Sequence, residues 1–241
     1  GLNRMASRQT PVEKEDLAKL LRRRLFSEVP EADEQREAYV LGFWDKLKSV
    51  DSVRASQAGA QGRFVRDYPF HPDLLERLYG KWSDLDAFQR TRGILQIFAT
   101  ALSEAETFDE SPIIAPQVFL KRPGEDGISK ALERLAEIAQ ESVDENPNWP
   151  YSLRTDLPRA KQAQAQEAGS LTAREIEASC VTAFLYSQPI GEQAEVSDIR
   201  WLIGSACEFP TVLNTGPIAY TSVSWYLEEC DTTDAAGVSR L

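Results

Sequence analysis

Apolar residues recur at helical spacing through the first half of the chain. Leu17, Leu20, Leu21 and Leu25 recur at helical spacing, which predicts an amphipathic helix. We expect this helix to begin near Thr10, because Thr10 can cap it, Pro11 suits its first position and Glu13 completes a capping box. A wide aromatic stripe predicts a second helix over residues 30–50, with a buried face.

The next segments alternate between polar loops and apolar helices. Residues 52–63 are small and polar, which is typical of a loop. Leucine, tyrosine and tryptophan then fall on one face of a short helix that begins at Pro72 and reaches Trp82. After a turn at residues 83–86, a longer helix is predicted through residues 94–102.

The helical pattern weakens in the middle of the chain. Two prolines interrupt the apolar run of residues 111–120, which fits an extended connector or a short edge strand. Residues 128–143 again have helical spacing. Residues 144–170 hold three prolines and few apolar side chains, so we expect a linker or variable insert there.

Three further helices are predicted in the last third, over residues 170–187, 196–206 and 217–231. Their spacing is typical of a helix-turn-helix or winged-helix unit, although the polar tail that would hold the wing, residues 231–241, is too short for a full hairpin. The fold class is therefore mainly α, and a helical bundle precedes a winged-helix-like unit. We expect three regions, 1–125, 126–169 and 170–241, of which the middle one is a helix plus a variable linker.

Composition narrows the classes of protein. An apolar fraction of 42% with 27% charged residues is ordinary for a globular chain, and no window approaches 18 consecutive apolar residues, so no membrane span is expected. The three cysteines lie far apart and there is one histidine, which argues against a disulfide framework and a zinc site. A reducing, cytoplasmic location fits this composition best.

Charge is unevenly distributed around a net value of −11. Residues 1–26 carry seven Lys and Arg against three acids, whereas residues 170–241 carry three Arg against ten acids. No Lys or Arg lies between Val212 and Asp231, where a recognition helix would need them, so we do not expect direct DNA binding. The acidic last third instead favours protein partners.

The chemical motifs are sparse. No phosphate-binding P-loop occurs, and the nearest segment, Gly124 to Lys130 (GEDGISK), has Ser before Lys and no β-branched strand ahead of it. We predict no catalytic residue and no metal site. His71 precedes Pro72 at a helix start, and we interpret it as an imidazole that closes the helix end or packs against Tyr68 and Phe70.

Arg90 and Arg92 lie at the start of a predicted helix, where the helix dipole disfavours cations. Two explanations stay open. The arginines form salt bridges with Asp84, Asp86 or Glu76, or they meet an anion, such as a nucleotide phosphate, that another domain or chain supplies.

Several segments together resemble the predicted prokaryotic ATPases of the AAA+ superfamily that carry a large domain of unknown function. They are LLRRRLF, YPFHPDLLERLYGKW followed by FQRTRGILQIFATAL, then ESPII, TAFLYSQPIG and SDIRWLIG. The resemblance runs from about residue 15 to residue 230; it is most specific at residues 68–102 and poor at residues 125–170. Genes of this family often lie beside DNA methylases and helicases in defence islands.

In that family an ATPase core with the phosphate-binding loop precedes these segments. The resemblance implies that this chain is the downstream part, a helical lid-like region and a winged-helix-like region whose partner is the core. ATP and Mg would then be bound mainly by residues absent here, and the chain would hold no cofactor of its own. By position, Arg92, or failing it Arg90, is the candidate to sense the γ-phosphate. The alternative is a stand-alone helical interaction module with an acidic docking face, and the residues favour an independent hydrolase least.

Overall fold

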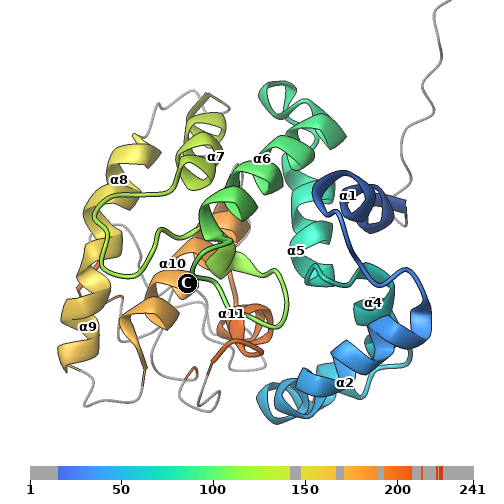
Figure 1. Ribbon diagram of the computed structural model, residues 1–241. Coiled ribbons are helices and arrows are strands. Elements are labelled where there is room, and N and C mark those ends of the chain that lie inside the picture. The colour runs from blue at the N-terminus through green and yellow to red at the C-terminus, as the bar shows by residue number, and fades with distance from the viewer. Residues whose placement is uncertain are drawn as a thin grey trace, which may run out of the picture.

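The computed structural model describes most of the chain (Figure 1). The described residues are 16–141, 148–166, 171–188 and 193–207, together with residues 213, 221, 223 and 224. This part is mainly helical and contains no β-strand, although one isolated parallel bridge joins Phe70 to Ile114. The predicted α class is therefore confirmed.

Four helices form the N-terminal side of the molecule. They are α1 (Leu17–Leu25), α2 (Asp33–Val50), α3 (Ser52–Ala55) and α4 (Ala60–Asp67). Helices α1 and α2 confirm the predicted apolar stripes. The loop expected at residues 52–63 is wrong, because α3 and the start of α4 lie there. Burial of Phe64 against the α2 aromatics explains the helix, since its edge meets Phe43 and Trp44 at ring-centroid distances of 6.1 and 5.4 Å.

Two helices joined by a turn follow. Helix α5 (Pro72–Arg77) runs on as a π-helical turn, η2 (Leu78–Trp82), and a short 3₁₀ turn, η3 (Asp86–Phe88), leads to α6 (Arg90–Ala105). The two helices predicted around residues 72–102 are thus confirmed. Beyond α6 the chain makes the bridge at Ile114 and the 3₁₀ turn η4 (Pro116–Phe119), which agrees with the connector reading of this segment.

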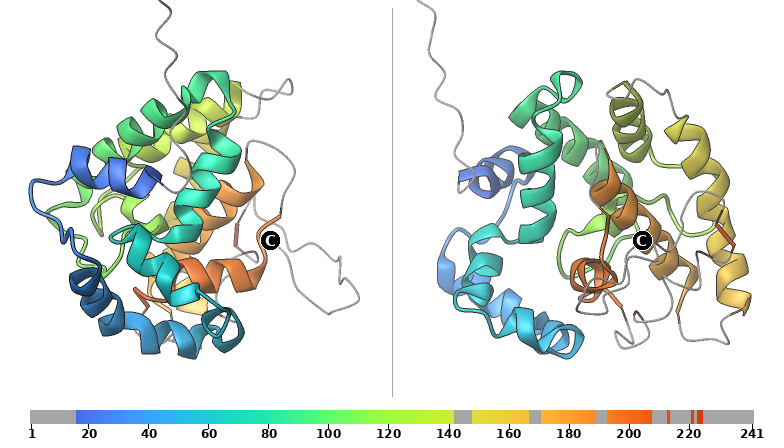
Figure 2. Two further views of the ribbon diagram at one scale, coloured as in Figure 1. Left: turned by 90° about the vertical axis from the view of Figure 1, so that its right-hand side faces the viewer. Right: turned by 180° about the vertical axis from the view of Figure 1, so that it is seen from behind.

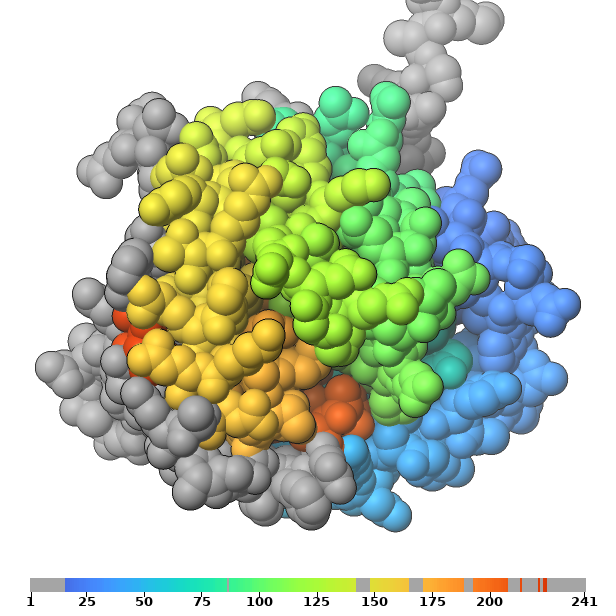
Figure 3. Space-filling model, turned by 60° about the vertical axis from the view of Figure 1, so that its left-hand side comes forward, coloured from blue at the N-terminus to red at the C-terminus, as the bar shows by residue number. Residues whose placement is uncertain are grey.

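The middle of the chain is more helical than its prolines suggest. Helix α7 (Lys130–Glu141) confirms the predicted helix, whereas residues 148–166, expected to be a linker, form α8 (Trp149–Asp156), the 3₁₀ turn η5 (Leu157–Arg159) and α9 (Ala160–Gln166). The prolines fit because they stand at the first positions of α8 and η5, where no N–H donor is needed. Figure 3 shows α7, α8 and α9, coloured yellow-green to yellow, next to one another on one face.

Helix α10 (Ala173–Ser187) passes through the centre of the molecule, and α11 (Val196–Ile203) follows it (Figure 1). Every residue from Ala178 to Tyr186 is buried, as expected for a helix surrounded by others on all sides. Helices α9 and α11 and the turn η4 pack against α10. The right-hand view of Figure 2 shows α10 and α11, both orange, between the blue-green N-terminal helices and the yellow ones.

The core is shared between the predicted regions. Its larger cluster contains Leu17 of α1, Phe98 of α6, Leu135 of α7 and Phe184 of α10. A smaller aromatic cluster joins α2 and α4 to Trp201 of α11. The division at residues 125 and 169 stays a prediction, but side chains from all three regions pack together.

Two expectations fall on residues outside the described part of the chain. The start of the first helix at Thr10 is one, and the wing expected after residue 231 is the other. The helix expected over residues 217–231 also lies almost entirely there, so the winged-helix unit stays a prediction. No helix within the described part is long and apolar enough to span a membrane.

Candidate functional site

His71 is a structural residue. Its Nδ1 accepts a hydrogen bond from the backbone N–H of Asp73 at 3.2 Å, so the imidazole caps α5 as expected. Because Nδ1 accepts, Nε2 carries the proton and donates to the carbonyl of Trp201 at 3.2 Å. The ring packs edge-on against Phe64 and Trp201, and not on the two neighbours expected from the sequence. Burial lowers the pKa of His71 to about 4, so the imidazole is neutral at physiological pH.

Arg90 and Arg92 lie together at the exposed start of α6. Glu76, one proposed partner, pairs instead with Arg63 at 3.0 Å. Neither arginine forms an ion pair or a hydrogen bond with the residues that the structure describes, a part that excludes the side chain of Asp86. The salt bridges that would have satisfied them internally are therefore absent from that part.

The backbone that carries these arginines is strained. Gln89 and Arg90 have φ values of 58° and 52°, in the left-handed region that non-glycine residues seldom adopt. Gly93 completes the turn, because a Cβ atom there would lie 1.7 Å from the carbonyl oxygen of Phe88. Phe88 itself is buried, which fixes the turn to the core. The guanidinium groups thus stand on an exposed but well-anchored turn.

The GEDGISK segment does not present a free helix start to a phosphate. The hydroxyl of Ser129 accepts from the N–H of Leu132 at 3.0 Å and donates to the carbonyl of Phe119 at 2.6 Å. The carboxylate of Glu104 accepts from the N–H of Lys130 at 3.1 Å. Side chains of this chain therefore already satisfy the first donors of α7. Among the described residues, no three His, Cys, Asp or Glu side chains are grouped to hold a metal ion.

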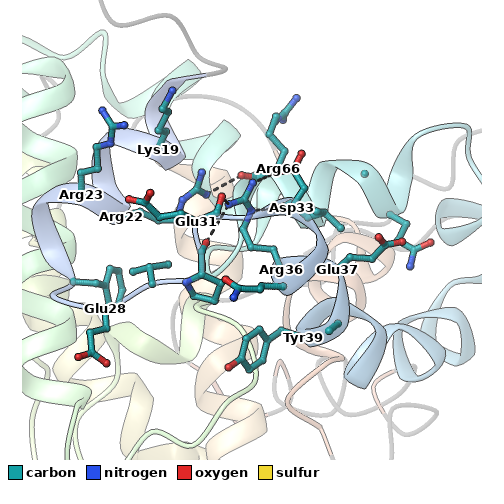
Figure 4. Close-up of a pocket in the computed structure, with 18 of the residues that line it drawn as sticks. Lys19, Arg22, Arg23, Glu28, Glu31, Asp33, Arg36, Glu37, Tyr39 and Arg66 are labelled. Carbon is teal, nitrogen blue, oxygen red and sulfur yellow. Dashed lines mark hydrogen bonds and ion pairs between the residues drawn. The ribbon is translucent and has the colours of Figure 1, made fainter.

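A groove of about 1490 Å³ lies between α1, the segment that follows it, α2 and α4 (Figure 4). We call it the α1–α2 groove. Lys19, Arg22 and Arg23 line it from α1, at the spacing that places three residues on one helix face. The carboxylates of Glu28, Glu31 and Glu37 line it from the connecting segment and α2.

Two arginines anchor the floor of this groove to the end of α4. Arg22 Nη1 donates to the carbonyls of Arg66 and Tyr68 at 2.8 and 2.7 Å. Arg36 Nε donates to the carbonyl of Val65 at 2.9 Å, and its other nitrogens bind the carbonyls of Pro30 and Glu31 and the carboxylate of Asp33. Both side chains thus satisfy carbonyls that the last turn of α4 leaves without helical partners.

The two anchors differ in what they leave free. Arg36 is buried and its three nitrogens are all bound. Arg22 is half-buried, and no described residue accepts from its Nε or Nη2, which form one of the two flat edges that bind a carboxylate or phosphate. Burial, followed by the nearby charge of Arg36, lowers the pKa of Arg22, and the charges of Asp67 and Asp33 oppose this shift. An anion beside the free edge would add to the favourable effect of these two carboxylates.

Arg22, Arg23 and Arg24 are consecutive in the sequence but differ in the structure. Arg22 is anchored in the groove, Arg23 lines the groove, and Arg24 is exposed and lies outside the lining. Helical spacing from Lys19 is the signal that could have grouped Lys19 with Arg22 and Arg23. Arg36 could not have been found in this way, because its partner Val65 belongs to α4, a helix that the sequence pattern does not predict.

Comparison with known proteins gives one match. No curated protein and no solved structure matches the chain. Residues 12–124, which include the α1–α2 groove and the Arg90–Arg92 turn, match the family model of the DUF499 second domain, a domain of unknown function.

Proposed function

We propose that this chain is a regulatory, lid-like module of an AAA+ type ATPase that is not catalytic by itself. Arg92, and secondarily Arg90, reach the terminal phosphate of an ATP–Mg complex that a separate core domain holds. Closure of the core on this module couples the state of the nucleotide to the engagement of a partner. The winged-helix-like region of residues 170–241, the cytoplasmic location and a role in anti-phage defence or DNA modification belong to the same proposal.

The observation that carries the proposal is the exposed turn at the start of α6. Two arginines project from it with no partner among the described residues, at a helix end where cations are disfavoured. Strained backbone at Gln89 and Arg90 is the kind of feature that clusters at functional sites. An incoming phosphate would compensate both the missing partners and the unfavourable helix end.

The family match supports a modular role. The matched domain is described as a second domain, which fits a chain that works beside another domain. This is what an arginine that acts on a nucleotide bound elsewhere requires.

The test compares the isolated chain with the complete protein that carries it. Alone, the chain is expected to bind and hydrolyse no ATP. In the complete protein, Arg92→Ala is expected to lower ATP hydrolysis about ten-fold or more, equivalent to about 1.4 kcal/mol of transition-state stabilisation. Arg24→Ala removes another exposed arginine, on α1, and should leave the rate unchanged. A complete protein that hydrolyses no ATP, or an Arg92→Ala variant with the normal rate, contradicts the proposal.

A second candidate is a helical protein-interaction module that works without nucleotide. The exposed aromatic and aliphatic side chains of Tyr39 and Leu41 on α2 favour it, since they are 57% and 56% exposed. The acidic last third would dock a basic partner in this case. Association should then weaken steeply with ionic strength, and Arg92→Ala should not affect it.

A further inference from the structure

We propose that the α1–α2 groove binds a mixed-charge peptide segment of a partner protein, and that the segment presents a carboxylate to Arg22. The site shares no residue with the Arg90–Arg92 turn, so it stands or falls separately from the nucleotide role.

The first reason is that Arg22 is prepared for a planar anion. Two backbone carbonyls fix its Nη1 atom, so little side-chain freedom remains to be lost on binding. The remaining edge, Nε and Nη2, matches the two oxygens of a carboxylate. In Figure 4, Arg22 lies in the middle of the groove, between Arg23 and Lys19 on one side and Arg36 on the other.

The second reason is the distribution of charge. Lys19 and Arg23 are exposed and form no ion pair or hydrogen bond within the described part of the chain. Glu28, Glu31 and Glu37 likewise have exposed carboxylates with no partner there. A phosphate or a nucleic acid would be attracted by Lys19 and Arg23 on the α1 side of the groove and repelled by the three glutamates on the other side. A peptide with both an acidic and a basic side chain can pair with the basic residues of α1 and with the glutamates opposite them.

The third reason is a preset aromatic contact at the groove edge. Tyr39 stacks on Tyr68 with ring centroids 5.4 Å apart and an angle of 11° between the planes, yet it remains mostly exposed. The carbonyl of the same Tyr68 anchors Arg22. Rigid exposed tyrosines next to an arginine are typical energetic centres of protein interfaces.

The experiment selects random dodecapeptides displayed on phage against the purified chain and measures the binding of the best synthetic peptide by fluorescence polarisation. The enriched peptides are expected to carry at least one acidic and one basic residue. Charge reversal tests each wall with a matched control on the same helix. Arg23→Glu should weaken binding about ten-fold or more, which is about 1.4 kcal/mol, whereas Arg24→Glu, outside the groove, should change it less than about two-fold.

Substitutions of the glutamates that line the groove distinguish a peptide from a phosphate ligand, because the two ligands predict opposite changes in binding. Glu37→Lys should weaken the binding of the peptide. Glu34→Lys, at an exposed position of α2 outside the lining of the groove, should leave this binding unchanged. If the natural ligand is a phosphate compound, Glu37→Lys should instead strengthen the binding of inorganic phosphate or ATP to the groove, and that result overturns the proposal. Failure to enrich any peptide family, or equal losses in the Arg23→Glu and Arg24→Glu variants, also overturns it. Arg22→Lys, which keeps the charge and loses the planar edge, completes the series.

Discussion

His71 and Trp201 are 130 positions apart in the chain and are joined by a hydrogen bond of 3.2 Å from the imidazole Nε2 to the backbone carbonyl. The same imidazole caps α5 through Nδ1. One neutral ring therefore links the start of α5 to α11, and both of its nitrogens are used. Protonation would turn Nδ1 into a donor facing a backbone donor, and this conflict has a measurable consequence.

Stability should depend on pH through His71. Its pKa is lowered from the ordinary 6.5 to about 4, so between these values the unfolded chain binds a proton that the folded chain does not. The free energy of unfolding should therefore be at its full value above about pH 6.5 and fall as the pH drops toward 4, by an amount on the order of a few kcal/mol. Urea titrations at several pH values measure this.

The matched variant is His71→Asn, since asparagine also caps helices but does not titrate. The difference in unfolding free energy between wild type and variant should shrink as the pH falls from 6.5 to 4. A difference that stays constant over this interval would show that the imidazole titrates alike in both states.

Trp82 should be a major source of stability. It is fully buried, its indole N–H donates to the carbonyl of Leu185 at 3.2 Å, and its ring lies 5.7 Å from that of Phe184. We expect Trp82→Ala to lower the free energy of unfolding by about 3–5 kcal/mol. Trp82→Phe keeps much of the ring but loses the hydrogen bond, and should cost less. Tyr151→Ala, at a side chain that is 56% exposed, serves as the control and should cost little.

Gly93 should not tolerate even a methyl group. A Cβ atom would overlap the carbonyl of Phe88, so Gly93→Ala must displace the turn that carries Arg90 and Arg92, at a cost on the order of 1–3 kcal/mol. Gly80→Ala, at an exposed position of η2 with no atom near its Cβ position, should be neutral or stabilise by about 0.4–1 kcal/mol. Chemical denaturation of the two variants compares them directly. Equal stabilities would mean that the turn relaxes freely.

Arg54 and Asp198 should be energetically coupled. Arg54 Nη2 lies 2.6 Å from Asp198 Oδ1, and both side chains are largely shielded from solvent. Asp198 also caps α11 by accepting from the N–H of Glu195, so single substitutions measure more than the ion pair. A double-mutant cycle with Arg54→Met and Asp198→Asn isolates the pair, and we expect a coupling free energy on the order of 0.5–3 kcal/mol. A coupling near zero would show that the contact is solvated and contributes nothing.

Local patterns were enough to predict the long helices. The leucine spacing of α1 and the apolar stripes of α2 and α6 follow from burial of one face, which the sequence displays directly. They were not enough for α4, whose helical state depends on Phe64 meeting aromatic rings from α2 and α11. Nor were they enough for α8 and α9, where prolines stand at helix starts and only the tertiary position of α10 shows which face is buried.

The sites divide in the same way. The helix-capping role of His71 was predictable because the residue stands directly before a proline-started helix, and the structure confirms it. The nucleotide role of Arg90 and Arg92 stays a prediction, although their exposure removes the simplest internal explanation within the described residues. The α1–α2 groove could not have been predicted, because its floor is formed by the end of α4, a helix that the sequence pattern does not predict.

The central position of α10 has a consequence for other proteins that carry a segment like residues 12–124. Here the inner faces of η2 and η4 rest on α10, which lies beyond the end of that segment. A relative that contains the segment without α10 would leave the indole of Trp82 and its neighbours in contact with water, a surface prone to aggregation. Such a relative must therefore supply a different apolar element at the same place, and that replacement could vary widely in sequence while the segment itself kept its shape.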